Sequence, residues 1–237
     1  MALSSVAQLY ETFKSYRLGD DFTGCEHCVT EESSAKLAAI PLRDLTALDL
    51  NRFAFKTMST WGTVRHFKHF LPRLLELLLC EFGVFDFPEV LIQKLNYAKW
   101  DQWPDSERVA VAQFLNYLVI HHLQEPPKFD GDDRIAVILH SCLLTTKTIT
   151  PFLKILIDQD NASSAHHLRE MINDMAEDIM AGERHDFNLT ISDEFVNWLV
   201  SNDVMSYLRQ FEAELVAKTP WLFHQLEGVR AAISSRG

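Results

Sequence analysis

Glycine and proline are scarce in this sequence, and their scarcity limits the folds that the chain can adopt. Only 8 of the 237 residues are glycine and 8 are proline, which is below the usual share of either in globular proteins. A β-sheet needs a turn between successive strands, and turns depend heavily on these two residues. The composition therefore favours α-helices joined by short loops.

Apolar residues recur at intervals of three and four along much of the chain, which is the spacing of one face of an α-helix. Residues typical of helix starts precede several of these segments, as at Thr46, where Asp49 stands three positions on in the pattern of a capping box. The clearest apolar series is Leu168, Met171, Ile172, Met175 and Ile179. These patterns predict an all-α protein, a multi-helix array or bundle of about 11–12 helices.

Two arrangements of such helices are open. Helices joined by short loops usually lie antiparallel, so they can stack as an α-solenoid or close into a compact bundle. No repeat of about 34 or 40 residues recurs along the chain, so the sequence does not decide between them. The length fits one helical domain, 1–237, and the polar stretch 124–133, which carries Pro and Gly, is where we expect any seam between two lobes.

The chain carries no pattern typical of secretion or of membrane insertion. No apolar run approaches the ~20 residues of a bilayer span, and the first residues, MALSSVAQLYETFKSYR, lack the basic start and apolar core of a signal peptide. Four cysteines in a chain of this length do not form a disulfide framework. We therefore expect a cytoplasmic protein in a reducing compartment.

Charge is unevenly distributed along the chain. The formal net charge is −11, which disfavours binding to a nucleic acid. Between Ile155 and Val216 acidic residues dominate and there is no Lys. Between Asn51 and Leu75 there is no Asp or Glu, and the cations there are Arg52, Lys56, Arg65, Lys68 and Arg73. This basic segment is either a functional patch or a set of solvated faces.

The stretch Gly24-Cys25-Glu26-His27-Cys28 has the C-x-x-C spacing that suits zinc. Zinc requires four ligands and the chain has no second C-x-x-C. The remaining ligands would be His27 in the turn itself, His66 and His69, Cys80, or Cys142 with His140. Two other interpretations stay open. The pair could be a redox dithiol, although no strand precedes it, or two small residues without chemistry.

A second candidate site lies in the expected helix over 64–76. Arg65, His69, Arg73 and Glu76 form a polar stripe on one face, and Pro72 is expected to kink or break the helix. Such a bend could gather Arg and His around a phosphate, a carboxylate or an acidic partner segment. The alternative is that the stripe pairs with acids of the protein itself. The residues expected to face the core are Val64, Phe67, Phe70, Leu71, Leu74 and Leu75.

Three segments give the chain a resemblance to other proteins. Gly24-Cys25-x-x-Cys28, Thr60-Trp61-Gly62 and Phe67-Lys68-His69-Phe70-Leu71-Pro72-Arg73 resemble a group of bacterial all-helical proteins with no assigned activity. The likeness covers 24–80, about a quarter of the chain. It implies a bacterial, cytoplasmic protein and carries over no site.

These observations favour a non-catalytic function. The sequence has no glycine-rich phosphate loop, no Gly-x-Ser-x-Gly elbow and no His-Glu-x-x-His helix. We expect a helical interaction module that binds a protein or acidic peptide near Arg65, His69 and Arg73, with a structural zinc at Cys25 and Cys28. The alternative is a metal- or thiol-dependent enzyme centred on Cys25, Cys28, His66 and His69.

Overall fold

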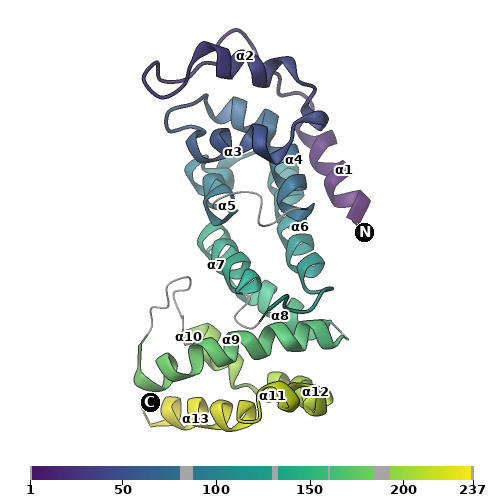
Figure 1. The fold of residues 1–237 in the computed structure, drawn as a ribbon, viewed down its shortest axis with the longest axis vertical. Helices are drawn as coiled ribbons and strands as arrows, with labels where there is room; N and C mark the ends of the chain where they lie inside the picture. The colour runs from purple at the N-terminus through teal and green to yellow at the C-terminus, as the bar shows by residue number, and fades with distance from the viewer. Residues whose placement is uncertain (1, 81–87, 130–132, 160, 184–192, 236–237) are drawn as a thin grey trace. The chain divides into compact units, whose positions relative to one another are not determined.

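The computed structural model describes residues 2–80, 88–129, 133–159, 161–183 and 193–235. The described residues form 13 α-helices, two short 3-10 helices and no strand, so the predicted all-α class is confirmed and the helix number slightly exceeds the expected 11–12 (Figure 1). The chain divides into two compact units, 1–118 and 119–237. The boundary falls near the end of the sixth helix, a few residues before the predicted seam at 124–133.

The N-terminal unit is organised around one long helix. Its α-helices are α1 (Ala2–Phe13), α2 (Glu31–Ala39), α3 (Ala47–Lys56), α4 (Val64–Cys80), α5 (Pro88–Tyr97) and α6 (Asp105–His122), which extends into the second unit. α1 and α3 both pack against α4 (Figure 1). The two 3-10 helices are η1 (Leu42–Asp44) and η2 (Trp100–Gln102).

Helix starts follow the capping residues. The Thr46 side chain accepts the N–H of Asp49, and the Asp49 carboxylate accepts the N–H of Thr46, so the predicted capping box of α3 is confirmed. Thr30 caps α2 in a similar way, since its hydroxyl accepts the N–H of Ser33. The expected stop at Phe82 and Gly83 lies outside the described residues.

α4 is buried over most of its circumference. The helix continues through Pro72, which is itself buried, so Pro72 does not break it. His66, which the sequence offers as a zinc ligand, is completely buried, whereas Val64, expected in the core, is 38% exposed. The amphipathic pattern fails here because α1, the loop after it and α3 all pack against α4, and Tyr10 and Tyr16 provide partners for its polar residues.

An aromatic cluster fills the core between α3, α4 and the loop that follows α1. Phe53 and Phe70 have ring centroids 4.5 Å apart, and Phe22 lies 5.4 Å from Phe70. Trp61 stacks on Phe22 and donates its indole N–H to the Ser34 hydroxyl at 3.0 Å. The cluster packs the loop that leads to Cys25 against α4, the helix that carries the second candidate site.

The C-terminal unit is built on α9. Asn161 caps this helix by accepting the N–H of Ser164 at 2.9 Å, and Gly182 ends it with a φ of 87°. α9 packs against α8, α12 and α13, and Figure 1 shows α13 running beside it. The helices are α7 (Arg134–Thr146), α8 (Thr150–Asp158), α9 (Ala162–Ala181), α10 (Asp193–Leu199), α11 (Asn202–Gln210), α12 (Glu212–Lys218) and α13 (Leu222–Ser234).

Candidate functional site

Backbone hydrogen bonds hold the turn that carries Cys25 and Cys28. The residues before the turn run antiparallel to those around Thr60. The Cys25 N–H donates to the Thr60 carbonyl at 2.8 Å, and the Gly62 N–H donates to the Thr23 carbonyl at 2.9 Å. Within the turn, the Cys28 N–H donates to the Cys25 carbonyl at 2.8 Å. The two segments singled out by the resemblance are therefore neighbours in space.

Gly24 is needed for this close approach. A Cβ atom at Gly24 would lie 2.6 Å from the Cβ of Val29 and 2.8 Å from the Thr60 carbonyl oxygen. Any other residue would push the two segments apart and break their pairing. The packing of this turn therefore requires glycine at position 24, whether or not a metal is bound.

The four predicted zinc ligands are not gathered. Among the described residues, no group of three or more His, Cys, Asp or Glu side chains is placed to hold a metal ion. Cys25 is exposed and Cys28 half-buried, whereas His66 is completely buried. Zinc at Cys25 and Cys28 stays a prediction, and it requires further ligands from side chains that now lie elsewhere.

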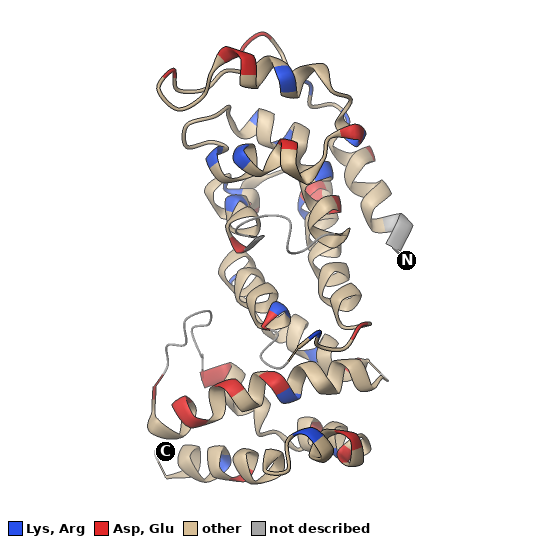
Figure 2. Cartoon of the chain, viewed as in Figure 1, with Lys and Arg blue, Asp and Glu red and all other residues tan. Residues whose placement is uncertain are grey.

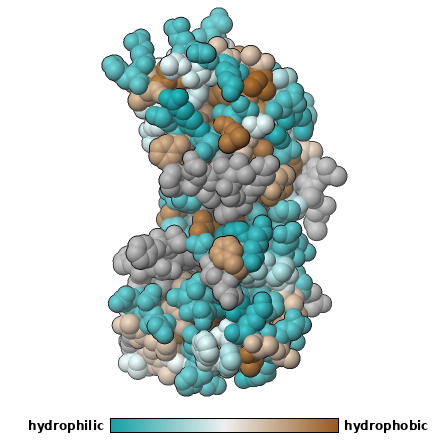
Figure 3. All heavy atoms as spheres, in the orientation of Figure 1, coloured by the Kyte–Doolittle hydropathy of each residue, from teal (hydrophilic) through white to brown (hydrophobic). Residues whose placement is uncertain are grey.

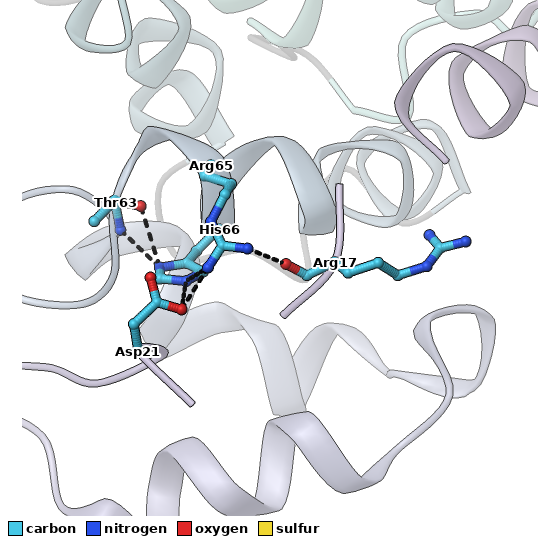
Figure 4. A network of polar contacts seen from close by, with 5 residues as sticks. All are labelled: Arg17, Asp21, Thr63, Arg65 and His66. Carbon is cyan, nitrogen blue, oxygen red and sulfur yellow. Dashed lines mark hydrogen bonds and ion pairs between the residues drawn. The ribbon is translucent and has the colours of Figure 1, made fainter. Parts of the chain in front are cut away.

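His66 ties the start of α4 to the loop that follows α1 (Figure 4). Its Nδ1 accepts the backbone N–H of Thr63 at 3.1 Å, and its Nε2 lies 3.4 Å from the Asp21 carboxylate. Arg65 forms an ion pair with the same carboxylate and donates to the Arg17 carbonyl at 2.7 Å. The arrangement resembles a capping box in which a neutral imidazole takes the place of the usual Glu or Gln.

The surroundings of His66 favour its neutral form. Because Nδ1 accepts an amide N–H, the proton of the neutral ring belongs on Nε2, which lies 3.4 Å from the Asp21 carboxylate and 3.1 Å from a guanidinium nitrogen of Arg65. Burial and the nearby Arg65 lower the pKa of His66, and Asp21 opposes them only in part. The hydrogen bond from Arg65 in turn lowers the pKa of Asp21. At neutral pH the cluster therefore consists of a neutral imidazole beside an exposed ion pair.

A buried ion pair lies one turn further along α4. The Nζ of Lys68 is 2.5 Å from the carboxylate of Glu107 on α6, and the two residues are only 7% and 5% exposed. The Tyr16 hydroxyl donates to Glu107 at 2.6 Å and accepts from Lys68 at 3.1 Å. Lys68 also lies 4.2 Å from the centre of the Trp103 ring. Burial and the hydrogen bond to Glu107 raise the pKa of Tyr16 to about 12.

His69 contacts the same loop as this buried pair. His69 Nδ1 lies 3.0 Å from the backbone carbonyl oxygen of Tyr16. Because a carbonyl oxygen only accepts, Nδ1 carries a proton and donates it to this hydrogen bond. Burial lowers the pKa of His69, and the nearby Arg17 contributes in the same direction. His69 is thus held as a neutral structural donor rather than as a cation open to an anion.

Arg73 and Glu76 belong to a third network. Arg73 donates through Nε to the Leu45 carbonyl and through Nη1 to the Glu76 carboxylate, each at 2.7 Å. The Tyr10 hydroxyl of α1 donates to the same carboxylate at 2.6 Å. Burial and the hydrogen bond to Glu76 raise the pKa of Tyr10. Both charged side chains are thus bonded to their neighbours, and α1 closes over them.

These contacts favour the second interpretation of the polar stripe, in which its residues pair with groups of the protein itself. Arg65, His69, Arg73 and Glu76 all make contacts inside the N-terminal unit. Their partners come from α1, the loops and α4 itself.

The outer face of α3 was not singled out by the sequence. Leu48 is 84% exposed and Phe55 is 53% exposed, and the two are seven residues apart, which places them on one face. Arg52 lies between them and donates to the Cys28 carbonyl at 2.6 Å. The helical spacing of the sequence could have predicted this face. Leu50, Phe53 and Ala54 lie on the buried side of the helix, which places Leu48 and Phe55 on the opposite side. Figure 3 shows apolar atoms among hydrophilic ones on the visible face of this unit.

The comparisons with known proteins add no family. No protein-family model, no curated protein and no solved structure matches this chain. The resemblance to a bacterial group therefore stays a prediction. Within the described residues, no helix has the length and apolar character needed to cross a membrane.

Proposed function

We propose that this protein is a non-catalytic interaction module that binds an acidic, amphipathic segment of a partner protein on the outer face of α3. The observation that carries the proposal is the exposure of Leu48 and Phe55 on either side of Arg52. Large apolar side chains exposed together on one helix face are typical of a protein-interaction surface.

The charges on α3 suggest the chemistry of the partner. Arg65, Lys68 and Arg73 of the basic segment are paired with acids, whereas Arg52 and Lys56 form no ion pair with a described residue. The single acid of α3, Asp49, is held by Thr46 and by Lys36 at 3.2 Å. A helix with apolar side chains on one face and acidic ones beside them complements this surface.

The predicted binding site near Arg65, His69 and Arg73 is less suited to a partner. A ligand there would have to displace the contacts of Arg65 with Asp21 and of Arg73 with Glu76. A ligand on the outer face of α3 would not have to displace an ion pair of this kind. A structural zinc at Cys25 and Cys28 would lie next to this face, since Arg52 already contacts the Cys28 carbonyl.

An enzyme centred on Cys25, Cys28, His66 and His69 is the weaker proposal. Such a site needs the thiols and imidazoles within reach of one reacting group or metal. Both imidazoles are instead engaged in hydrogen bonds of the N-terminal unit.

The proposal is tested with a pair of designed peptides. One forms an amphipathic helix with Leu and Glu, and the other carries Lys in place of each Glu. Fluorescence anisotropy should show binding of the acidic peptide and weaker binding as salt is raised. The double variant Leu48→Ser/Phe55→Ser should bind at least about tenfold more weakly, which corresponds to the loss of two buried apolar side chains.

Val109→Ser is the matched control, because Val109 is 49% exposed on α6 of the same unit. It should leave the affinity unchanged. Equal binding of the acidic and basic peptides, or equal loss in the control and the α3 variant, would show that α3 is not the docking face.

A further inference from the structure

The C-terminal unit contains a pocket that the proposed function does not use. It has a volume of about 480 Å³ and lies among α8, α10 and α11. This volume is within the range of sites that hold small molecules or single side chains of a peptide. The lining residues on which the argument depends are Lys154, Asp158, Trp198, Asp203 and Tyr207.

Three exposed charged groups line this pocket. Lys154, Asp158 and Asp203 form no ion pair or side-chain hydrogen bond within the part of the chain that the structure describes. This differs from the N-terminal unit, where Arg65, Lys68 and Arg73 all meet an acid. Charges that a fold leaves without partners beside a concave surface are available to a ligand.

Aromatic side chains form part of the wall of the pocket. Tyr207 is only 5% exposed, and its hydroxyl donates to the Asn161 carbonyl at 3.1 Å, so its position is fixed. Trp198 is half-buried and packs against Phe195 with ring centroids 5.9 Å apart. Trp198, Asp158 and Asp203 line the same pocket, and a pocket that contains an indole ring and carboxylates favours an organic cation.

The net charge of the C-terminal unit also favours a cationic ligand. Residues 119–237 contain 10 Lys and Arg against 18 Asp and Glu, a formal charge of −8, whereas residues 1–118 contain 12 against 15, a charge of −3. Figure 2 shows several of the acids along α9. The field of this unit therefore attracts cations and repels anions.

We propose that this pocket binds the guanidinium or alkylammonium group of an organic ligand. The cation lies against Trp198 and between Asp158 and Asp203, and Lys154 donates to a carbonyl or carboxylate of the same ligand. A neutral ligand would cover the two carboxylates without neutralising them, which costs free energy. The ligand class is thus arginine-like or lysine-like, either free or as a side chain of a peptide.

The first experiment uses N-acetyl-arginine amide as the probe and the complete protein. Binding is followed through the NMR signal of the Trp198 indole N–H, which is assigned by its loss in Trp198→Phe. We expect this signal to shift with a Kd in the millimolar range or tighter, as is usual for a ligand of this size. The citrulline analogue has nearly the same shape without the charge and should bind at least about tenfold more weakly. This comparison requires no variant in the binding site.

Two variants with the same change in net charge locate the site. Asp158→Asn/Asp203→Asn should weaken binding at least about tenfold. Glu227→Gln and Glu212→Gln together remove two exposed acids of the same unit outside the pocket and should change the Kd by less than about twofold. Thermal unfolding of each variant checks that it is folded.

Each outcome decides the proposal. It is overturned if the probe does not shift the Trp198 signal, if the citrulline analogue binds equally well, or if both double variants lose affinity alike. Agmatine and an arginine-containing pentapeptide then separate the two sources. Tighter binding of agmatine supports a free organic cation, and tighter binding of the pentapeptide supports a side chain of a protein partner.

Discussion

The two units of this protein use their charged residues differently. In the N-terminal unit the cations of α4 meet acids of α6, of the loop after α1 and of α4 itself, and the most buried pair joins Lys68 to Glu107, 39 residues further along the chain. In the C-terminal unit Lys154, Asp158 and Asp203 surround a pocket and pair with nothing described. The cations of α4 thus connect distant segments of the first unit, whereas these three charged groups of the second unit stay available to a ligand.

The buried ion pairs show the same difference. Lys68 and Glu107 lie on different helices, and Tyr16 from a third segment bonds to both. Arg169 pairs with its sequence neighbour Glu170 on α9, so that contact closes no long loop, although Arg169 also donates to Thr219 at 2.8 Å. The Lys68–Glu107 pair thus joins two helices of the N-terminal unit, whereas the Arg169–Glu170 pair stays within α9.

The largest effect is expected from Glu107→Gln. The substitution keeps the shape of the side chain but leaves the ammonium group of Lys68 buried without a counter-charge. We expect the free energy of unfolding of the N-terminal unit to fall by about 3–5 kcal/mol. Replacing both partners, as in Lys68→Met/Glu107→Met, should recover more than half of this loss.

Urea unfolding measures this effect in a background that reports on one unit. With Trp198 and Trp221 replaced by Phe, the remaining tryptophans are Trp61, Trp100 and Trp103, all in the N-terminal unit. A loss below about 1 kcal/mol in Glu107→Gln would mean that the pair is not the connection we describe.

A smaller effect is expected from Arg73→Glu. It places a carboxylate beside Glu76 and removes the donors to Glu76 and to the Leu45 carbonyl. We expect a loss of about 2 kcal/mol, in the range for half-buried groups left unsatisfied. Arg108→Glu is the control in the same unit, because Arg108 also pairs at i,i+3, with Asp105 at 2.5 Å, but is 45% exposed.

The control should change the free energy of unfolding by less than about 1 kcal/mol. Equal losses in Arg73→Glu and Arg108→Glu would indicate that Arg73 is a surface residue, and the predicted anion site at the stripe would regain support.

Helix boundaries could be predicted from the sequence because their signals are local. Thr30, Thr46 and Asn161 each bond to an N–H three residues ahead, so a short stretch of sequence contains all that determines the helix start. The same holds for the apolar series on α9, of which every member is buried.

The surroundings of α4 could not be predicted because they depend on distant residues. Tyr10 and Glu76 are 66 residues apart, and Tyr16 and Glu107 are 91 apart. Seen alone, a stripe of Arg, His and Glu is indistinguishable from a solvated face. Only the contacts with α1 and the loops show that the residues of the stripe have partners, and they leave the outer face of α3 as the better candidate for binding.

A pH effect of intermediate size distinguishes His66 from the other charged groups. Its folded pKa is lowered, chiefly by burial, so the unfolded chain binds a proton more readily than the folded one. The stabilisation is therefore present above the unfolded pKa of about 6.5 and is lost as the pH falls below it. Protonation also removes the acceptor for the Thr63 N–H and adds a cation at a helix N-terminus.

We expect the N-terminal unit to lose stability between pH 7.5 and pH 5.5. His69 contributes in the same direction, because its pKa is lowered as well. His66→Gln keeps an acceptor near the Thr63 N–H and cannot titrate, so its stability should fall less over this range. Urea unfolding at both pH values measures the difference, and parallel curves for the two proteins would assign the pH dependence to other groups.

The smallest effect is expected from Cys25→Ser/Cys28→Ser. The turn is held by the N–H and carbonyl groups of Cys25 and by the space beside Gly24, none of which the substitution alters. We therefore expect the free energy of unfolding to change by less than about 0.5 kcal/mol. The measurement is thermal unfolding of both proteins together with elemental analysis of protein purified without a chelator or a polyhistidine tag. One zinc ion per chain, with a loss of several degrees in the variant, would contradict this expectation, because a metal bound only to the folded chain adds its binding free energy to folding. It would also show that the turn and its neighbours rearrange to supply the missing ligands.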